Sequence, residues 1–83
     1  MTRRAVLAGS FDPITLGHLD ILRRGLTLFD EVVLACGHNP KKNAVLPLEV
    51  RMEILRECTL GLDGVRVEQF SGLLVDFCRE VDA

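Results

Sequence analysis

Three short segments with strand-like composition alternate along the chain with three segments whose apolar residues recur at helical spacing. The strand-like segments span residues 4–8, 31–37 and 65–70, and the helical segments span residues 18–29, 48–60 and 73–81. Strands separated by helices of this length pair in parallel through right-handed crossovers. The sequence therefore predicts an α/β fold with a parallel sheet in the order βαβαβα.

The three strand-like segments differ in their expected burial. Residues 4–8 and 31–37 are dominated by apolar side chains, which favours buried strands. In residues 65–70 apolar and polar side chains alternate, which suits a less deeply covered strand at a sheet edge. Pro47 is well suited to the first turn of the second helix, because that turn needs no backbone N–H from it.

Composition excludes several classes of function. The chain has 83 residues, so it is one small domain or a piece of one, and 48% hydrophobic with 27% charged residues is typical of a folded domain. A net charge of -2 argues against a general nucleic-acid binder, and no apolar run reaches membrane-spanning length, so we expect neither partner. Small anionic ligands need only local positive charge.

The cysteines favour a reducing compartment. Cys36, Cys58 and Cys78 are spaced too widely for a zinc knuckle, and their odd number does not suit a disulfide framework. We therefore expect a cytoplasmic protein in which the cysteines, like His38, are structural or incidental.

Polar and special residues follow each predicted strand, in residues 9–15 (GSFDPIT), 38–43 (HNPKKN) and 71–74 (SGLL). Ligands of parallel α/β sheets bind beyond the carboxyl ends of the strands, where these three loops must meet. In the first loop, Gly9 permits close approach of a ligand and Ser10 offers a hydroxyl donor. Gly17 and His18 open a helix whose N–H groups favour an anion.

These residues predict a phosphate site of an unusual kind. The chain contains neither the G-x-x-x-x-G-K-[ST] pattern nor the G-x-G-x-x-G pattern. Pro13 fixes one backbone angle, and Asp12 is expected to accept local backbone N–H bonds that pin the turn. Asp20 is expected to support the first helical turn through the helix dipole.

The stretch GSFDPITLGHLDI, residues 9–21, resembles the signature of the nucleotidylyltransferases with a T/H-x-G-H motif. Its F-D-P-I-T-x-G-H-x-D-I form is similar to the phosphopantetheine adenylyltransferase family, and FDEVVLACGHNPKKN, LEVRMEI and FSGLLVDFCRE resemble later segments of that family without gaps. Thr15 replaces the first histidine of the wider superfamily's H-x-G-H, which suits the pantetheine branch. The resemblance implies a Rossmann-like nucleotidylyltransferase fold, with residues 1–83 as the N-terminal part of a single domain.

The resemblance also implies an activity. The family transfers an adenylyl group reversibly from ATP to 4'-phosphopantetheine, with Mg²⁺, giving dephospho-coenzyme A and pyrophosphate in coenzyme A biosynthesis. ATP, 4'-phosphopantetheine and dephospho-coenzyme A or coenzyme A are the implied ligands, and a homohexamer is the implied assembly.

Site residues carry over by position. The resemblance implies that Ser10 and His18 contact ATP phosphates, that Phe11 contacts the nucleotide through its backbone, and that His18 stabilises the transition state. It places Ser10 and Lys42 on the phosphate of 4'-phosphopantetheine and Leu74 on the pantetheine arm, and it assigns no metal ligand. A phosphate monoester is already an anionic nucleophile, so this chemistry needs positive donors and no general base.

Simpler interpretations remain open. Lys41 and Lys42 also suit a solvated loop, and Leu74 also suits the core as part of an apolar stripe with Leu73, Phe77 and Val81. The family continues past Ala83 with further ATP-binding segments, so we expect the 83 residues alone to be inactive or weak. The alternatives are a non-catalytic piece that binds a phosphorylated ligand or only self-assembles, and a nucleotidylyltransferase for another phosphate acceptor.

Overall fold

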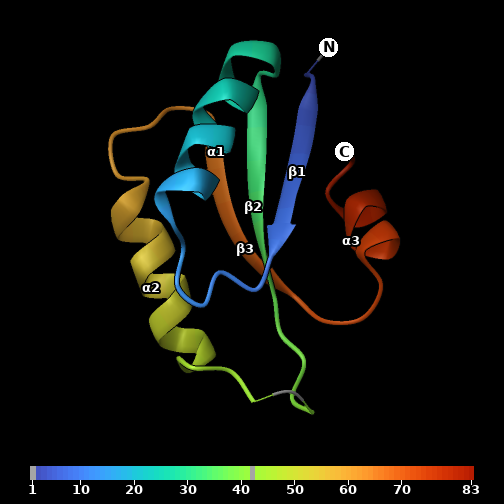
Figure 1. Ribbon diagram of the computed structural model, residues 1–83. Coiled ribbons are helices and arrows are strands. Elements are labelled where there is room, and N and C mark those ends of the chain that lie inside the picture. Colours follow the sequence, from blue (N-terminus) through green and yellow to red (C-terminus); the bar gives the residue numbers. More distant parts are fainter. Residues whose placement is uncertain (1, 42) are drawn as a thin grey trace.

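The computed structural model describes residues 2–41 and 43–83. Within them lie a parallel sheet in the order β1-β2-β3 and three helices, which follow the strands in turn (Figure 1). The bounds are β1 Arg4–Gly9, α1 Leu16–Leu28, β2 Glu31–Gly37, α2 Leu48–Cys58, β3 Val65–Phe70 and α3 Leu74–Glu80. The predicted α/β class, element order and parallel pairing are confirmed.

The helices cover both faces of the sheet: α1 and α2 lie on one face and α3 on the other (Figure 1). This division follows from the alternation of side chains along β2. Val32, Leu34 and Cys36 pack into a cluster with residues of α1 and α2. Val33 and Ala35 pack into a second cluster with Phe77 and Val81. The run of apolar residues 32–36 in β2 is therefore buried on both faces of the sheet.

Only the central strand is deeply buried. Residues 32–36 of β2 are buried, whereas each residue of β1 is only partly buried. The prediction that residues 4–8 form a buried strand is wrong in this respect, because β1 has a single neighbour in the sheet. The prediction of an edge position for residues 65–70 is confirmed by β3.

The helix ends differ from the predicted ones by one or two residues. α1 begins at Leu16, before the predicted His18, because Thr15 caps it. Pro47 lies at the N-cap of α2, one position before the first turn, and α2 ends at Cys58 instead of Leu60. α3 is one residue shorter at each end than predicted.

The earlier start of α1 also changes the interpretation of Asp20. This residue lies beyond the first helical turn, which contains no acidic residue. Its carboxylate instead pairs with Arg24 one turn later, at 3.1 Å from Nε. The predicted interaction of Asp20 with the helix dipole is therefore wrong.

An ion-pair network joins the strands at their amino-terminal end. Glu31 of β2 lies 2.6 Å from Arg4 Nε of β1 and 3.3 Å from Arg66 Nη1 of β3, and Arg66 also pairs with Glu68. Arg4 donates a further hydrogen bond to the carbonyl of Val81 after α3. Burial by itself would raise the pKa of Glu31, but the hydrogen bonds from Arg4 and Arg66 lower this pKa below its usual value.

Candidate functional site

A cleft of about 690 Å³ lies at the carboxyl ends of the strands, where the three loops meet. Its lining includes Ser10 and Asp12 from the loop after β1, His38 and Lys41 from the loop after β2, and Ser71 and Gly72 from the loop after β3. The prediction that these loops meet beyond the carboxyl ends of the strands is thus confirmed. Their polar side chains surround a space large enough for a small ligand.

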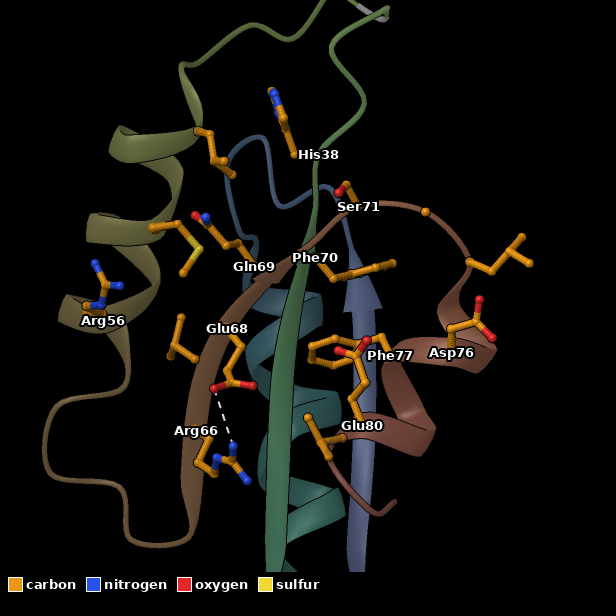
Figure 2. A pocket seen from close by; sticks show the side chains of 16 residues that line it. His38, Arg56, Arg66, Glu68, Gln69, Phe70, Ser71, Asp76, Phe77 and Glu80 are labelled. Atoms are coloured by element: carbon orange, nitrogen blue, oxygen red, sulfur yellow. Dashed lines mark hydrogen bonds and ion pairs between the residues drawn. The ribbon is translucent and has the colours of Figure 1, made fainter.

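A larger hollow of about 970 Å³ follows the free edge of β3 (Figure 2). The ion pair between Arg66 and Glu68 lies along it, and Phe70 and Phe77 form part of its wall. The hollow meets the cleft at the residues that line both, which are His38, Phe70, Ser71 and Gly72. Ser10 lines the smaller cleft and is not among the described residues that line this hollow, so the smaller cleft is the better candidate site.

Phe11 anchors the loop after β1. Its backbone has a φ of 46°, which is uncommon and costly for a residue with a side chain. Its side chain is only 1% exposed and joins the core under α1 and α2, so packing offsets that cost. Only the backbone of Phe11 is left for a ligand, in line with the backbone contact that we predict.

Thr15 holds the imidazole of His18 in one orientation. The backbone N–H of Thr15 donates to His18 Nδ1 at 3.0 Å, and the Thr15 hydroxyl accepts from the His18 backbone N–H at 3.3 Å. Because Nδ1 accepts a hydrogen bond, the proton of the neutral ring sits on Nε2. The ring also packs edge-on against Phe11, with the two centroids 5.0 Å apart. His18 is therefore a held Nε2–H donor.

Asp12 connects the first loop to the second. Its two carboxylate oxygens accept from the backbone N–H groups of Val45 at 2.6 Å and Leu46 at 2.7 Å, which lie 33 and 34 residues further along the chain. The prediction that Asp12 pins its own turn through local bonds is wrong. Both oxygens are engaged by the segment that leads into α2, and the sequence carries no local signal for a contact of this range.

Arg51 of α2 is the residue that sequence analysis missed. Its side chain reaches under both loops: Nη1 donates to the carbonyl of Ser10 at 2.9 Å and of Gly37 at 3.3 Å, and Nε donates to Leu46 at 3.1 Å. The residue is only 2% exposed. In the sequence it resembles an ordinary surface arginine of an amphipathic helix, and only the packing of α2 on the sheet buries it.

The charge of Arg51 is not neutralised by a neighbouring carboxylate. None of the ion pairs between described residues includes Arg51, and its hydrogen bonds go to carbonyls and to neutral side chains. A buried cation without an anionic partner is costly, because it has lost its hydration. It makes the floor of the cleft favourable for an anionic ligand.

Cys36 adds to this floor without offering a nucleophile. Its thiol donates to the carbonyl of Ser10 at 3.3 Å, and burial raises its pKa although the nearby Arg51 lowers it. The thiol therefore stays protonated near neutral pH, which makes it unreactive. The structural role that we predict for this cysteine agrees with its complete burial.

The structure places the predicted site residues in different surroundings. Ser10 is exposed and lines the cleft. Phe11, His18 and Leu74 are described but are not part of the lining of the cleft. Lys42 lies outside the described residues. The cleft thus includes one of the four predicted residues that can be located, and His18 lies outside its lining.

The interpretation of Leu74 as a core residue is wrong. Phe77 and Val81 of the predicted stripe are buried, but Leu73 is 68% exposed and Leu74 is 43% exposed. Of this stripe, Phe77 and Val81 are the residues that pack against Val33 and Ala35 of the sheet. The side chain of Leu74 is accordingly available to a ligand or to another surface.

The residues that the structure describes contain neither a cluster of metal ligands nor a membrane-spanning helix. No group of three or more His, Cys, Asp or Glu side chains is placed to hold a metal ion. No described helix is both long and apolar enough to cross a membrane.

Comparison with known proteins gives consistent results. Residues 6–83 match the cytidylyltransferase-like family. The chain is 54% identical over 80 residues to phosphopantetheine adenylyltransferase from Nocardioides sp., covering 96% of this chain and 50% of that protein. Its identity to phosphopantetheine adenylyltransferase from Desulfatibacillum aliphaticivorans is 47% over 83 residues, covering 100% of this chain and 47% of that protein. The chain thus spans about half the length of the curated relatives it matches.

Solved structures show the same fold. The crystal structure of NadR protein in complex with NAD and AMP-PNP superposes with a TM-score of 0.77 at 24% identity, covering 86% of this chain and 21% of that chain. The NadR structure in complex with NR gives a TM-score of 0.75 at 25% identity, covering 82% of this chain and 19% of that chain. Because the family match and the curated relatives both extend over nearly all of its residues, the chain belongs to the cytidylyltransferase-like family and is homologous to the phosphopantetheine adenylyltransferases.

Proposed function

We propose that residues 1–83 are the N-terminal part of a phosphopantetheine adenylyltransferase domain. The reaction is the reversible transfer of an adenylyl group from ATP to 4'-phosphopantetheine, which gives dephospho-coenzyme A and pyrophosphate. The observation that carries this proposal is the turn from Ser10 to His18, in which Thr15 holds the imidazole as an Nε2–H donor. The homology of the chain supports the same activity.

The proposed chemistry needs no nucleophile from the protein. An oxygen of the 4'-phosphopantetheine phosphate attacks the α-phosphorus of ATP, a new P–O bond forms, and the bond from the α-phosphorus to the bridging oxygen breaks so that pyrophosphate leaves. No proton has to be removed from the attacking group. The main barrier is bringing two polyanions together, which preorganised positive donors lower.

Each predicted residue has a role in this scheme. Ser10 and His18 donate to ATP phosphates, and His18 stabilises the charge that develops at the α-phosphorus. Phe11 contacts the nucleotide through its backbone, Ser10 and Lys42 hold the phosphate of 4'-phosphopantetheine, and Leu74 contacts the pantetheine arm. The exposure of Ser10 and Leu74 and the burial of the Phe11 ring support these assignments.

Mg²⁺ in this proposal is carried by the phosphates of ATP, which is a usual way for this ion to enter phosphoryl-transfer sites. Asp12 is the carboxylate that lines the cleft, and both of its oxygens accept backbone N–H groups. The described residues therefore do not fit a magnesium site built by the protein alone.

We further propose a cytoplasmic protein that assembles as a homo-oligomer, a hexamer by family resemblance, and that binds dephospho-coenzyme A or coenzyme A as a ligand. The exposed apolar side chains at the start of α3, Leu73, Leu74 and Val75, support an interaction surface of some kind.

A non-catalytic role is the second candidate. The cleft is lined by Ser10 but not by His18, which favours binding of a phosphorylated ligand by these residues without the full reaction. The relatives are about twice as long as this chain, so residues outside it are available to complete their sites.

The test is an assay of dephospho-coenzyme A formation from Mg-ATP and 4'-phosphopantetheine, with the complete gene product and with the 83-residue chain in parallel. We expect turnover by the former and little or none by the latter. Calorimetry with each ligand separates the candidates: binding of 4'-phosphopantetheine without turnover in either protein supports the non-catalytic role. Turnover with CTP in place of ATP, or with another phosphate acceptor, identifies a different nucleotidylyltransferase.

A further inference from the structure

His38 lies at the junction of all three loops. Its backbone N–H donates to the carbonyl of Phe70 at 3.0 Å, which fixes the end of β2 against the end of β3. Figure 2 shows its ring pointing away from Glu68 and Arg66, toward the loops at the carboxyl end of the sheet. The half-buried side chain lines both the cleft and the hollow beside β3.

The buried guanidinium of Arg51 determines the tautomer of this ring. Arg51 Nη2 lies 3.3 Å from His38 Nδ1. A guanidinium has only donors, so the contact is favourable when Nδ1 is the acceptor and the ring proton sits on Nε2. Arg51 is itself held by the carbonyls of Ser10, Gly37 and Leu46. The ring of His38 is thereby kept as an Nε2–H donor.

Several side chains around His38 offer hydrogen-bond donors to the cleft. Ser10, Lys41 and His38 bring N–H or O–H groups, and the carboxylate of Asp12 is engaged by two backbone amides. The uncompensated charge of Arg51 lies beneath them. A phosphoryl group offers several anionic oxygens, so it suits such a set of donors.

We propose that His38 is a substrate-binding residue, which donates its Nε2–H to a phosphoryl oxygen of the acceptor substrate in the cleft, and that Arg51 is the positioning residue that holds it in this form. This inference rests on the proposed function, because that function supplies the phosphorylated acceptor. It adds a second held imidazole to the one that Thr15 controls at His18.

Two substitutions distinguish the contributions of the two ring nitrogens of His38. His38→Asn places an amide oxygen near Nδ1, where it still accepts from Arg51, but removes the Nε2–H. His38→Gln places an amide N–H₂ near Nε2 and loses the acceptor at Nδ1. We expect His38→Asn to weaken binding of 4'-phosphopantetheine about tenfold in the complete gene product, and His38→Gln to retain binding within about threefold, because only the latter keeps the donor. ATP affinity should be unchanged in both.

The measurement is calorimetry with 4'-phosphopantetheine, inorganic phosphate and ATP as separate probes. If His38→Asn binds each of the two probes, phosphate and 4'-phosphopantetheine, as tightly as the unsubstituted protein does, the role of His38 is overturned. The proposal of adenylyl transfer is not affected by that result. If the unsubstituted protein binds phosphate but not 4'-phosphopantetheine, the proposed acceptor is wrong, and a loss of phosphate binding in His38→Asn still supports the donor. Binding of neither probe overturns both proposals.

The positioning role of Arg51 has a spectroscopic readout. Imidazole ¹⁵N chemical shifts distinguish Nε2–H from Nδ1–H rings, and the chain has only two histidines, so the His38→Asn spectrum assigns the signals. We expect His38 in the unsubstituted protein to be the Nε2–H tautomer, and Arg51→Lys to change this ring to a mixture while His18 stays as it was. A predominantly Nδ1–H ring at His38 in the unsubstituted protein would refute the proposal.

Discussion

The two ends of the sheet both use a partly or fully buried arginine, but they use it differently. At the amino-terminal end, Arg4 donates to the backbone carbonyl of Val81 and pairs with Glu31 at 2.6 Å. At the carboxyl-terminal end, Arg51 donates to the carbonyls of Ser10 and Gly37, and it has no carboxylate partner among the described residues. In the first arrangement the charge of Arg4 is neutralised by Glu31. In the second, the charge of Arg51 is left for an anionic ligand to neutralise.

This difference separates structure from function within one small fold. The paired charges at the amino-terminal end hold the strands together and leave no unpaired charge for a ligand. An unpaired buried cation at the other end is justified energetically only when an anion approaches it, because an isolated charge is otherwise costly to bury. Substitutions at the carboxyl end should therefore change activity, and substitutions at the amino end should change stability alone.

The largest functional effect is expected for His18→Ala in the complete gene product. Loss of one preorganised donor to transition-state charge costs about 3 kcal/mol, which is roughly a hundredfold in rate. His18→Asn is the matched control, since its side-chain oxygen can still accept the Thr15 N–H. A similar loss of kcat/KM in both variants supports the donor role, whereas recovery in His18→Asn would mean that His18 acts only as part of the cap.

The largest effect on stability is expected for Gly64→Ala, close to the amino-terminal end of β3. Gly64 has a φ of 83°, and a Cβ there would lie 2.8 Å from the backbone oxygen of Asp30. Strain and the steric clash together should lower the free energy of unfolding by about 3 kcal/mol, measured by urea denaturation. Gly61→Ala is the control, because its φ is 82° but its surroundings are open. Equal losses in the two variants would show that backbone strain alone matters.

A smaller effect is expected for Thr15→Val, which keeps the shape of the side chain and removes the capping hydroxyl. The loss of an N-cap hydrogen bond costs about 1 kcal/mol of stability. Thr15→Ser should restore it. Because the backbone N–H of Thr15 still holds His18 Nδ1, we expect kcat/KM to fall much less than in His18→Ala. The hydroxyl also lies 3.0 Å from His18 Nδ1, so a rate loss as large as that of His18→Ala would mean that the hydroxyl is needed to hold the ring or that it contacts substrate itself.

The smallest effect is expected for Glu31→Gln, at about 1 kcal/mol or less at neutral pH, because this ion pair is partly exposed. The folded-state pKa of Glu31 is lowered, so its contribution is present above the unfolded value near 4.5 and is lost as the pH falls through the folded value. The stability gap between the two proteins, followed by urea denaturation from pH 7 to pH 3, should therefore close on acidification. A gap that widens would contradict the assigned network.

Local patterns were sufficient for most of the fold. The bounds of β2 and β3 match the predicted residues, and helix ends differ by at most two residues. Thr15 is the instructive error, because the cap moved the helix start to Leu16 and removed Asp20 from the first turn. The edge position of β1 was not predictable from its apolar residues, since it depends on which neighbours the sheet provides.

The order of elements, their parallel pairing and the turn that leads to His18 all follow from residue spacing, because hydrophobic periodicity and turn chemistry are local properties. The contacts that shape the cleft are not local: Asp12 reaches Val45 and Leu46, and Arg51 reaches Ser10 and His38. A side chain's burial and its partners depend on which elements pack together. For this reason the sequence predicted which loops line the cleft, while the three-dimensional packing of α2 against two of these loops created the buried charge beneath it.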